Sequence, residues 1–287
     1  MIVSIASGKG GTGKTTISTN MALALERPLT LIDCDVEEPN AHLFIHPEVE
    51  RKQTISVPAP EVNLDQCSFC KKCVEICQFN AITVLKKTVL TFPNLCHSCD
   101  GCRIVCPEGA IQMGKREIGV VEIGKKDQIR FLTGRLNIGE AMAPPLIRSV
   151  KGMIGDAENV IIDAPPGTSC PVITAIKDTD VVLLVTEPTP FGLHDLKLAV
   201  AAIRVLNIPC GLVINRSDIG DSRVYEFAKQ EQIPILMEIP FNRQIAEFYA
   251  TGRPFVDGMP EWRKRFVRLY EDICGLVKER KGSEGIS

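Results

Sequence analysis

The chain has 287 residues, of which 45% are hydrophobic and 24% charged, and its formal net charge at pH 7 is −2. This length accommodates one large α/β domain with a small insert, and the near-neutral charge excludes a general attraction to nucleic acid. No apolar run approaches the roughly 18 residues of a membrane span, and the N-terminus lacks the basic stretch of a secretory signal. The 12 cysteines of such a chain predict a reducing cytoplasm and metal ligation.

The first residues carry the pattern of a nucleotide-binding α/β fold. We expect a buried strand over 2–7, a glycine-rich loop over 8–15, a helix over 16–26 and a second strand over 29–33. This order predicts a mostly parallel sheet with helices on both faces, as in P-loop NTPases.

The glycine-rich loop matches the pattern G-x4-G-K-[ST] from Gly8 to Thr15. Lys14 is predicted to neutralise the β and γ phosphates of the nucleotide, and the Thr15 hydroxyl to bind Mg²⁺. A chance glycine-rich turn is the alternative, which the flanking strand and helix oppose. Backbone N–H groups of the loop and of the first helical turn should surround the phosphates, and these belong to Gly8, Gly10, Gly11, Thr12, Gly13, Lys14, Thr15 and Thr16.

Eight cysteines form two runs with the spacing C-x2-C-x2-C-x3-C, and the second run repeats the first 29 residues later. In two-cluster proteins with this spacing, the fourth cysteine of each run binds the other [4Fe–4S] cluster. We therefore predict two crossed ligand sets. The first cluster takes Cys67, Cys70, Cys73 and Cys106, and the second takes Cys96, Cys99, Cys102 and Cys77.

The segment 61–114 thus resembles a two-cluster bacterial ferredoxin, which implies a small α+β domain that carries electrons. The second run ends in Cys106-Pro107, as the bacterial pattern does, whereas Gln78 follows Cys77 where such ferredoxins usually have proline. Zinc sites usually show paired C-x2-C motifs with longer gaps, and disulfides need an oxidising compartment, so both alternatives are disfavoured.

The remaining chain alternates between predicted strands and helices. Residues 119–134 predict a hairpin, and the proline-bearing segment 48–61 a linker that leads into the insert. Without 61–114 the alternation is continuous, so residues 1–60 and 115–287 should form one discontinuous ATPase core. Further strands are expected at 159–163, 180–186, 210–215 and 235–239, and helices at 191–206, 242–250 and 260–280.

Lys9, which directly follows Gly8, makes the loop resemble the deviant phosphate loop of the family that includes MinD, ParA, Mrp and the nitrogenase iron protein. In that family the early lysine reaches the nucleotide of the partner subunit. The resemblance therefore implies an ATP-dependent homodimer, or a heterodimer with a homologous ATPase. A solvated loop lysine is the alternative for Lys9.

Two acidic strand ends extend this resemblance. Asp35 matches the switch residue that activates the attacking water, and Asp163 matches the acid of the second switch that holds the Mg²⁺ shell. Asp33 could support Mg²⁺ through water, and capping of the next turn is the alternative for the acids at 33 and 35. Asn215 and Pro240 match the adenine side of the family's pocket, which implies ATP or ADP as ligand.

Other cysteines and the terminal helix are less informative. Cys170 lies just past the second switch, as a solvent-facing thiol near a dimer axis, a transient ligand or a small packed residue, and Cys274 is expected in the core. The apolar residues of the helix near 260–280 are expected to pack on the domain, although MinD uses such a helix on membranes.

Three functions fit these observations. The first is an ATPase whose Mg²⁺-dependent dimer and switch cycle gates electron transfer through two [4Fe–4S] clusters to a redox partner protein. The second is an Mrp-like carrier that delivers clusters or metallocofactors to an acceptor protein. The third, a positioning ATPase, predicts binding to lipid or DNA, which the neutral charge disfavours.

Overall fold

The computed structural model describes residues 1–284, with side chains as far as residue 278 in the last helix. One sheet has nine strands: β1 (Ile2–Ala6), β2 (Leu29–Asp33), β3 (Glu48–Val62), β6 (Ile111–Lys126), β7 (Ile129–Leu136), β8 (Val160–Asp163), β9 (Val181–Thr186), β10 (Cys210–Asn215) and β11 (Ile235–Ile239). Their order is β11-β10-β9-β1-β8-β2-β7-β6-β3. Strands β11 to β7 are parallel to one another, and β6 is antiparallel to both β7 and β3. The predicted mostly parallel α/β sheet is confirmed.

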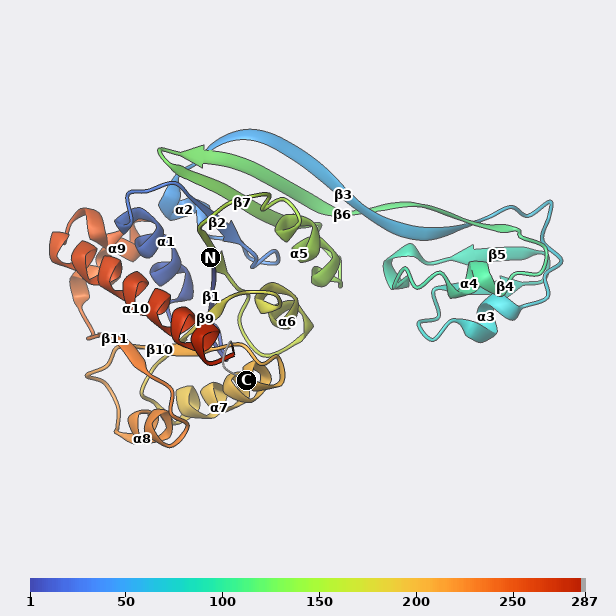
Figure 1. Ribbon diagram of the computed structural model, residues 1–287. Coiled ribbons are helices and arrows are strands. Elements are labelled where there is room, and N and C mark those ends of the chain that lie inside the picture. The colour runs from blue at the N-terminus through green and yellow to red at the C-terminus, as the bar shows by residue number, and fades with distance from the viewer. Residues whose placement is uncertain (285–287) are drawn as a thin grey trace.

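Helices cover both faces of this sheet (Figure 1). One face carries α1 (Lys14–Ala24), α2 (His42–Ile45), α9 (Arg243–Ala250), η2 (Phe255–Asp257) and α10 (Pro260–Glu284), and the other carries α5 (Ala143–Lys151), α6 (Cys170–Ile176), α7 (Pro190–Val205) and α8 (Arg223–Gln230). A separate hydrophobic core lies under each layer. The central strands read as apolar runs because both of their faces are buried.

Most elements begin and end within a few residues of the predicted positions, but the sequence analysis missed the short helices α2, α5, α6 and α8. The last helix packs on the domain as expected, since Trp262, Phe266 and Ile273 are at most 5% exposed. Within the part of the chain that the structure describes, no helix is both long and apolar enough to cross a membrane.

The segment expected as a linker is instead strand β3, which pairs with β6 from Glu48 to Val62 and continues with it beyond β7 as a two-stranded ribbon (Figure 1). The linker prediction was wrong because Pro58 and Pro60 were taken as breaks. Both lie in an edge strand, where alternate residues need no N–H donor, so two prolines two residues apart are tolerated. The predicted hairpin at 119–134 is present as β6 and β7, with Asp127 at φ 50° in its turn.

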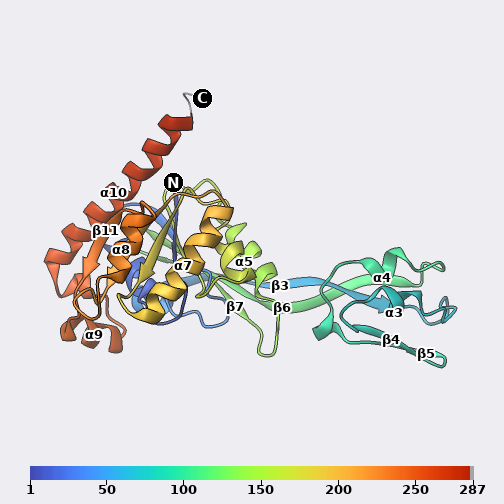
Figure 2. The same cartoon turned by 90° about the horizontal axis from the view of Figure 1, so that it is seen from below.

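The cysteine repeats lie at the far end of this ribbon, away from the main sheet (Figure 2). They surround a two-stranded sheet of β4 (Ile82–Leu85) and β5 (Thr88–Thr91), with the short helices α3 (Lys72–Ile76), η1 (Pro93–Leu95) and α4 (Gly101–Ile104). The strands β3 and β6 run without interruption across positions 61 and 114. The division into a core and an inserted domain therefore stays a proposal.

Candidate functional site

The glycine loop joins the end of β1 to the start of α1. Gly13, at φ 100°, is the residue before the helix, and a Cβ there would lie 2.7 Å from the side-chain nitrogen of Asn215. A Cβ at Gly8 would lie 2.2 Å from the carbonyl oxygen of Asp195. Both positions therefore require glycine. The first turn of α1 contains no acidic residue, so its free N–H groups remain attractive to phosphate.

Sheet topology brings the predicted acids together beside this loop. Strands β2 and β8 are parallel neighbours with Asp33 in register with Asp163, so both carboxylates emerge at the same edge. Asp33 is fully buried and accepts hydrogen bonds from the backbone N–H groups of Asp35, Asn40 and Ala41, at 3.1, 3.0 and 3.0 Å. The structure therefore favours the turn-capping alternative for Asp33, which holds the loop containing Asp35 against the sheet.

Lys14 lies near Asp163 and Asp35 and is only 7% exposed. Burial lowers its pKa, and the nearby Asp163 and Asp35 oppose that change. Burial also raises the pKa of Asp163 to about 6, with Thr15 and Lys14 acting to lower it. Neither carboxylate oxygen of Asp163 has a hydrogen-bond partner of ordinary geometry within the described residues. These orphaned oxygens, next to the Thr15 hydroxyl, fit a hydrated Mg²⁺ ion.

Titration of Asp35 and Asp163 gives the first testable prediction. Burial raises the pKa of each from 3.8 to about 6. Their ionisation therefore destabilises the nucleotide-free protein as pH rises from about 4 through about 6, because the unfolded chain loses these protons first. A Mg²⁺ ion held by Asp163 would need the ionised carboxylate, so affinity for Mg·ATP should rise over the same range.

Calorimetric titration of Mg·ATP across this pH range, with thermal unfolding of the nucleotide-free protein, checks both effects. Asp163→Asn is the control, because the amide has the same shape and does not titrate. Since ATP itself titrates nearby, the informative quantity is the difference between the two proteins. Parallel pH profiles for both would contradict the assignment of Asp163.

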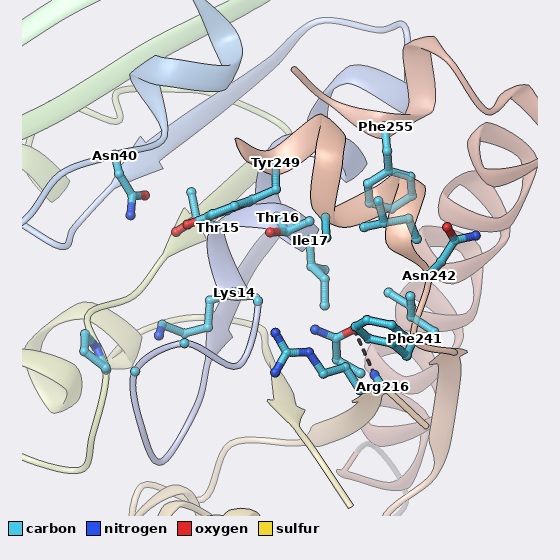
Figure 3. A pocket seen from close by; sticks show the side chains of 18 of the residues that line it. Lys14, Thr15, Thr16, Ile17, Asn40, Arg216, Phe241, Asn242, Tyr249 and Phe255 are labelled. Carbon is cyan, nitrogen blue, oxygen red and sulfur yellow. Dashed lines mark hydrogen bonds between the residues drawn. The ribbon is translucent and has the colours of Figure 1, made fainter. Parts of the chain in front are cut away.

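A cavity of about 380 Å³ extends from the glycine loop toward α9, a size that suits a nucleotide. Its lining includes Lys14, Asp35, Asn215 and Pro240. Figure 3 shows Phe241 and Phe255 around the end that faces away from Lys14, whereas the ring of Tyr249 extends toward Thr15. The sequence analysis missed these aromatic residues, since nothing in their spacing distinguishes them from residues of an ordinary helix and turn.

Asn215 lines the cavity and also braces it. Its amide nitrogen donates to the carbonyl oxygen of Thr12 at 2.9 Å, and its side-chain oxygen accepts from the N–H of Arg216 at 3.0 Å. The residue at the end of β10 thereby holds the glycine loop in place.

Lys9 forms an ion pair within its own chain. Its Nζ lies 3.3 Å from Oε2 of Glu187, and Arg216 lies 3.0 Å from the other oxygen of that carboxylate. Glu187, which follows β9, is only 7% exposed. The sequence analysis missed Glu187 and Arg216, because they follow separate strands that only the sheet brings together.

The eight cysteines line two cavities at the far end of the ribbon. One cavity is lined by Cys67, Cys70, Cys73 and Cys106, and the other by Cys77, Cys96, Cys99 and Cys102. No three His, Cys, Asp or Glu side chains of the described residues are placed to hold a single metal ion. A cubane cluster places different demands on the chain, because each of its four thiolates binds a separate iron atom.

The backbone around these cavities repeats with the sequence. Positive φ angles occur at Phe69, Lys71 and Asn80, and again 29 residues later at Ser98, Asp100 and Gly109. These turns direct backbone N–H groups at sulfur: Phe69 to Cys67 at 3.4 Å, Ser98 to Cys96 at 3.4 Å and Ala81 to Cys77 at 3.3 Å. Such donors stabilise thiolates, so the residues present fit two four-cysteine clusters.

The other cysteines lie apart from these cavities. Cys170 is exposed at the start of α6, whereas Cys34 is buried, and burial raises its pKa strongly. Cys274 is partly buried and packs against the core under α10.

A glycine loop after β1, a buried lysine and two acidic strand ends define a P-loop nucleotide-binding protein. The family model for the CobQ/CobB/MinD/ParA nucleotide binding domain matches residues 3–255, and the chain belongs to this family. The resemblance inferred from the loop is confirmed at that level.

Individual proteins extend the comparison. An uncharacterized protein of Methanocaldococcus jannaschii is 33% identical over 264 residues, which span 89% of this chain and 91% of that protein. The iron-sulfur cluster carrier protein of Aquifex aeolicus is 24% identical over 304 residues, which span 97% of this chain and 68% of that protein. The cell division ATPase MinD of Pyrococcus furiosus has a similar fold, with a TM-score of 0.58, 24% identity and coverage of 96% and 98% of the two chains.

Proposed function

We propose that this protein is a Mg²⁺-dependent ATPase whose nucleotide cycle gates electron transfer to a partner protein through the cysteine module of residues 61–114. The observation that carries the proposal is the pair of cavities, each lined by four cysteines in the crossed arrangement. When bound there, two [4Fe–4S] clusters would each accept and release one electron at low potential. Four cysteine ligands per cavity favour retention of a cluster over its transfer.

At the nucleotide site, each side chain has a separate task. Lys14 and the N–H groups at the start of α1 hold the phosphates, and Thr15 with Asp163 holds Mg²⁺. Asp35, in its ionised form, accepts a proton from the attacking water. Asn215 and Pro240 bound the adenine side of the cavity.

Dimer formation is the proposed gate. For Lys9 to reach a nucleotide bound by a partner subunit, it must leave its own Glu187, so closure of the dimer and release of this ion pair are coupled. The partner subunit is a second copy or a homologous ATPase. The protein is proposed to work in the cytoplasm.

The alternative is ATP-dependent delivery of clusters, which the name of the Aquifex relative and the exposed Cys170 support. The test is anaerobic: the reduced, iron-loaded protein is studied by EPR and potentiometry without nucleotide, with ADP·Mg and with ATP·Mg. A nucleotide-dependent change in signal or potential at constant iron content is expected for gated electron transfer. No change, with ATP-dependent loss of iron and sulfide to an apo-acceptor, would establish the carrier function instead.

A further inference from the structure

A buried ion pair joins the ribbon to the nucleotide-binding core. Arg116 lies on β6 and pairs with Glu140, in the loop between β7 and α5, and their side chains are 9% and 5% exposed. In every other ion pair of the described residues, at least one side chain is more than a tenth exposed, whereas here both are less exposed than that. Two buried charges carry a large desolvation cost, so mere stability is a poor explanation for them.

On one side, this pair reaches a cysteine cavity. The second amino group of Arg116 donates to the carbonyl oxygen of Cys96 at 3.4 Å. Two residues along, the Ser98 hydroxyl donates to the carbonyl oxygen of Pro58 on β3 at 2.6 Å. The backbone of residues 96–98 is therefore held against both strands of the ribbon, with a guanidinium group beside it.

On the other side, the pair reaches the loop that carries Asp35. The N–H of Leu136, the last residue of β7, donates to the carbonyl oxygen of Val36 at 2.8 Å, and the next residue, Asn137, donates to Ile118 on β6 at 2.9 Å. The N–H of Glu140 then donates to Asn137 at 3.0 Å. Val36 directly follows Asp35, so a series of hydrogen bonds and chain segments leads from the Asp35 loop to Glu140.

We propose that Arg116 and Glu140 are positioning residues that transmit the nucleotide state from the Asp35 loop to the cavity of Cys77, Cys96, Cys99 and Cys102. The inference rests on the proposed function and adds the route by which the nucleotide state reaches the cysteine cavity. A shift of the loop after β7 moves Glu140 and with it the guanidinium charge beside Cys96. A charge that moves near a cluster changes the reduction potential of that cluster. A moved backbone also changes the hydrogen-bond donors to the Cys96 sulfur. The other cavity has no such link in the described bonds of Arg116, so its response should be weaker.

The test compares two double variants of the whole iron-loaded protein. Arg116→Met with Glu140→Gln removes the buried pair without leaving one charge unpaired. The matched control is Lys52→Met with Glu122→Gln, the corresponding neutralisation of a lysine–glutamate pair that joins β3 to β6 at 2.7 Å, with Lys52 64% exposed. Iron content, ATP affinity and the reduced EPR spectrum are measured with ADP·Mg and with ATP·Mg.

The expected result is that the nucleotide-dependent change in EPR signal and potential is lost in the first variant and retained in the control, with ATP affinity equal in both. If the wild-type protein responds and the first variant responds equally, the route is wrong while gated electron transfer stands. If the wild-type protein does not respond, the proposed function itself fails.

A second measurement covers the case in which the first variant loses iron. Amide hydrogen exchange of the iron-loaded wild-type protein is followed with ADP·Mg and with ATP·Mg. Exchange is expected to change over 35–41, 137–142 and 94–99. A change at 35–41 that does not extend to 94–99 would overturn the route.

Discussion

Replacement of Lys14 by alanine is expected to lower affinity for Mg·ATP by about thirtyfold or more, because loss of one partner from a desolvated charge pair costs about 2–5 kcal/mol. The lysine is 7% exposed and lies between Asp163 and Asp35, so the variant also leaves two carboxylates without their cation. Calorimetric titration of Mg·ATP measures the loss.

The same variant should keep the brown absorbance and the iron content of the wild-type protein, because the cysteine module lies along the outer part of the ribbon, away from the phosphate loop (Figure 1). Lys9→Ala is the matched control. It alters a lysine of the same loop whose partner is Glu187, so the single subunit should still bind Mg·ATP while dimer formation is lost. Loss of iron together with ATP binding in Lys14→Ala would show that the two parts do not fold separately.

The sequence predicts those parts of the fold that depend on local patterns. The run from Val181 to Thr186 identifies a buried parallel strand, and the glycines at 8 and 13 have steric reasons that the structure makes explicit. The cysteine spacing also predicts which residues line a common cavity. Local sequence suffices there because each run folds into the same turns, as the repeated positive φ angles show.

Long-range partners are what the sequence does not reveal. Glu187 meets Lys9 and Arg216 only because β9 lies between β1 and β10. Arg116 meets Glu140 across the β6–β7 hairpin and the loop that follows it. Any arginine and glutamate at such a separation look like surface residues in the sequence, since burial depends on how the ribbon and the loop are packed.

The ribbon matters for function as well as for fold. A flexible linker would isolate the cysteine module from the ATPase core, whereas β3 and β6 are hydrogen-bonded along their whole length and continue the main sheet. Val36 is hydrogen-bonded to the end of β7, and β7 is paired with β6, so a change at the Asp35 loop acts on a continuous sheet. This continuity makes nucleotide control of the distant cysteine module physically reasonable.

The second prediction with a large effect concerns crossed ligation, in which the fourth cysteine of each run binds the cluster of the other run. Cys73 and Cys106 belong to different sequence runs but line one cavity, whereas Cys73 and Cys102 line different cavities. The double variant Cys73→Ala with Cys106→Ala should therefore keep about half of the iron, because only one cluster loses ligands. Cys73→Ala with Cys102→Ala should lose nearly all of it.

Ligation within each run would give a different result, since Cys73 with Cys106 would then disable both clusters. Iron analysis and EPR of anaerobically purified protein distinguish the two cases, with Cys274→Ala as a control outside both cavities. Because bound metal supplies folding energy to small domains, the variant that loses both clusters should also unfold residues 61–114. Far-UV circular dichroism and proteolysis should detect that loss, while Mg·ATP binding persists because the phosphate loop and its acids belong to the main sheet.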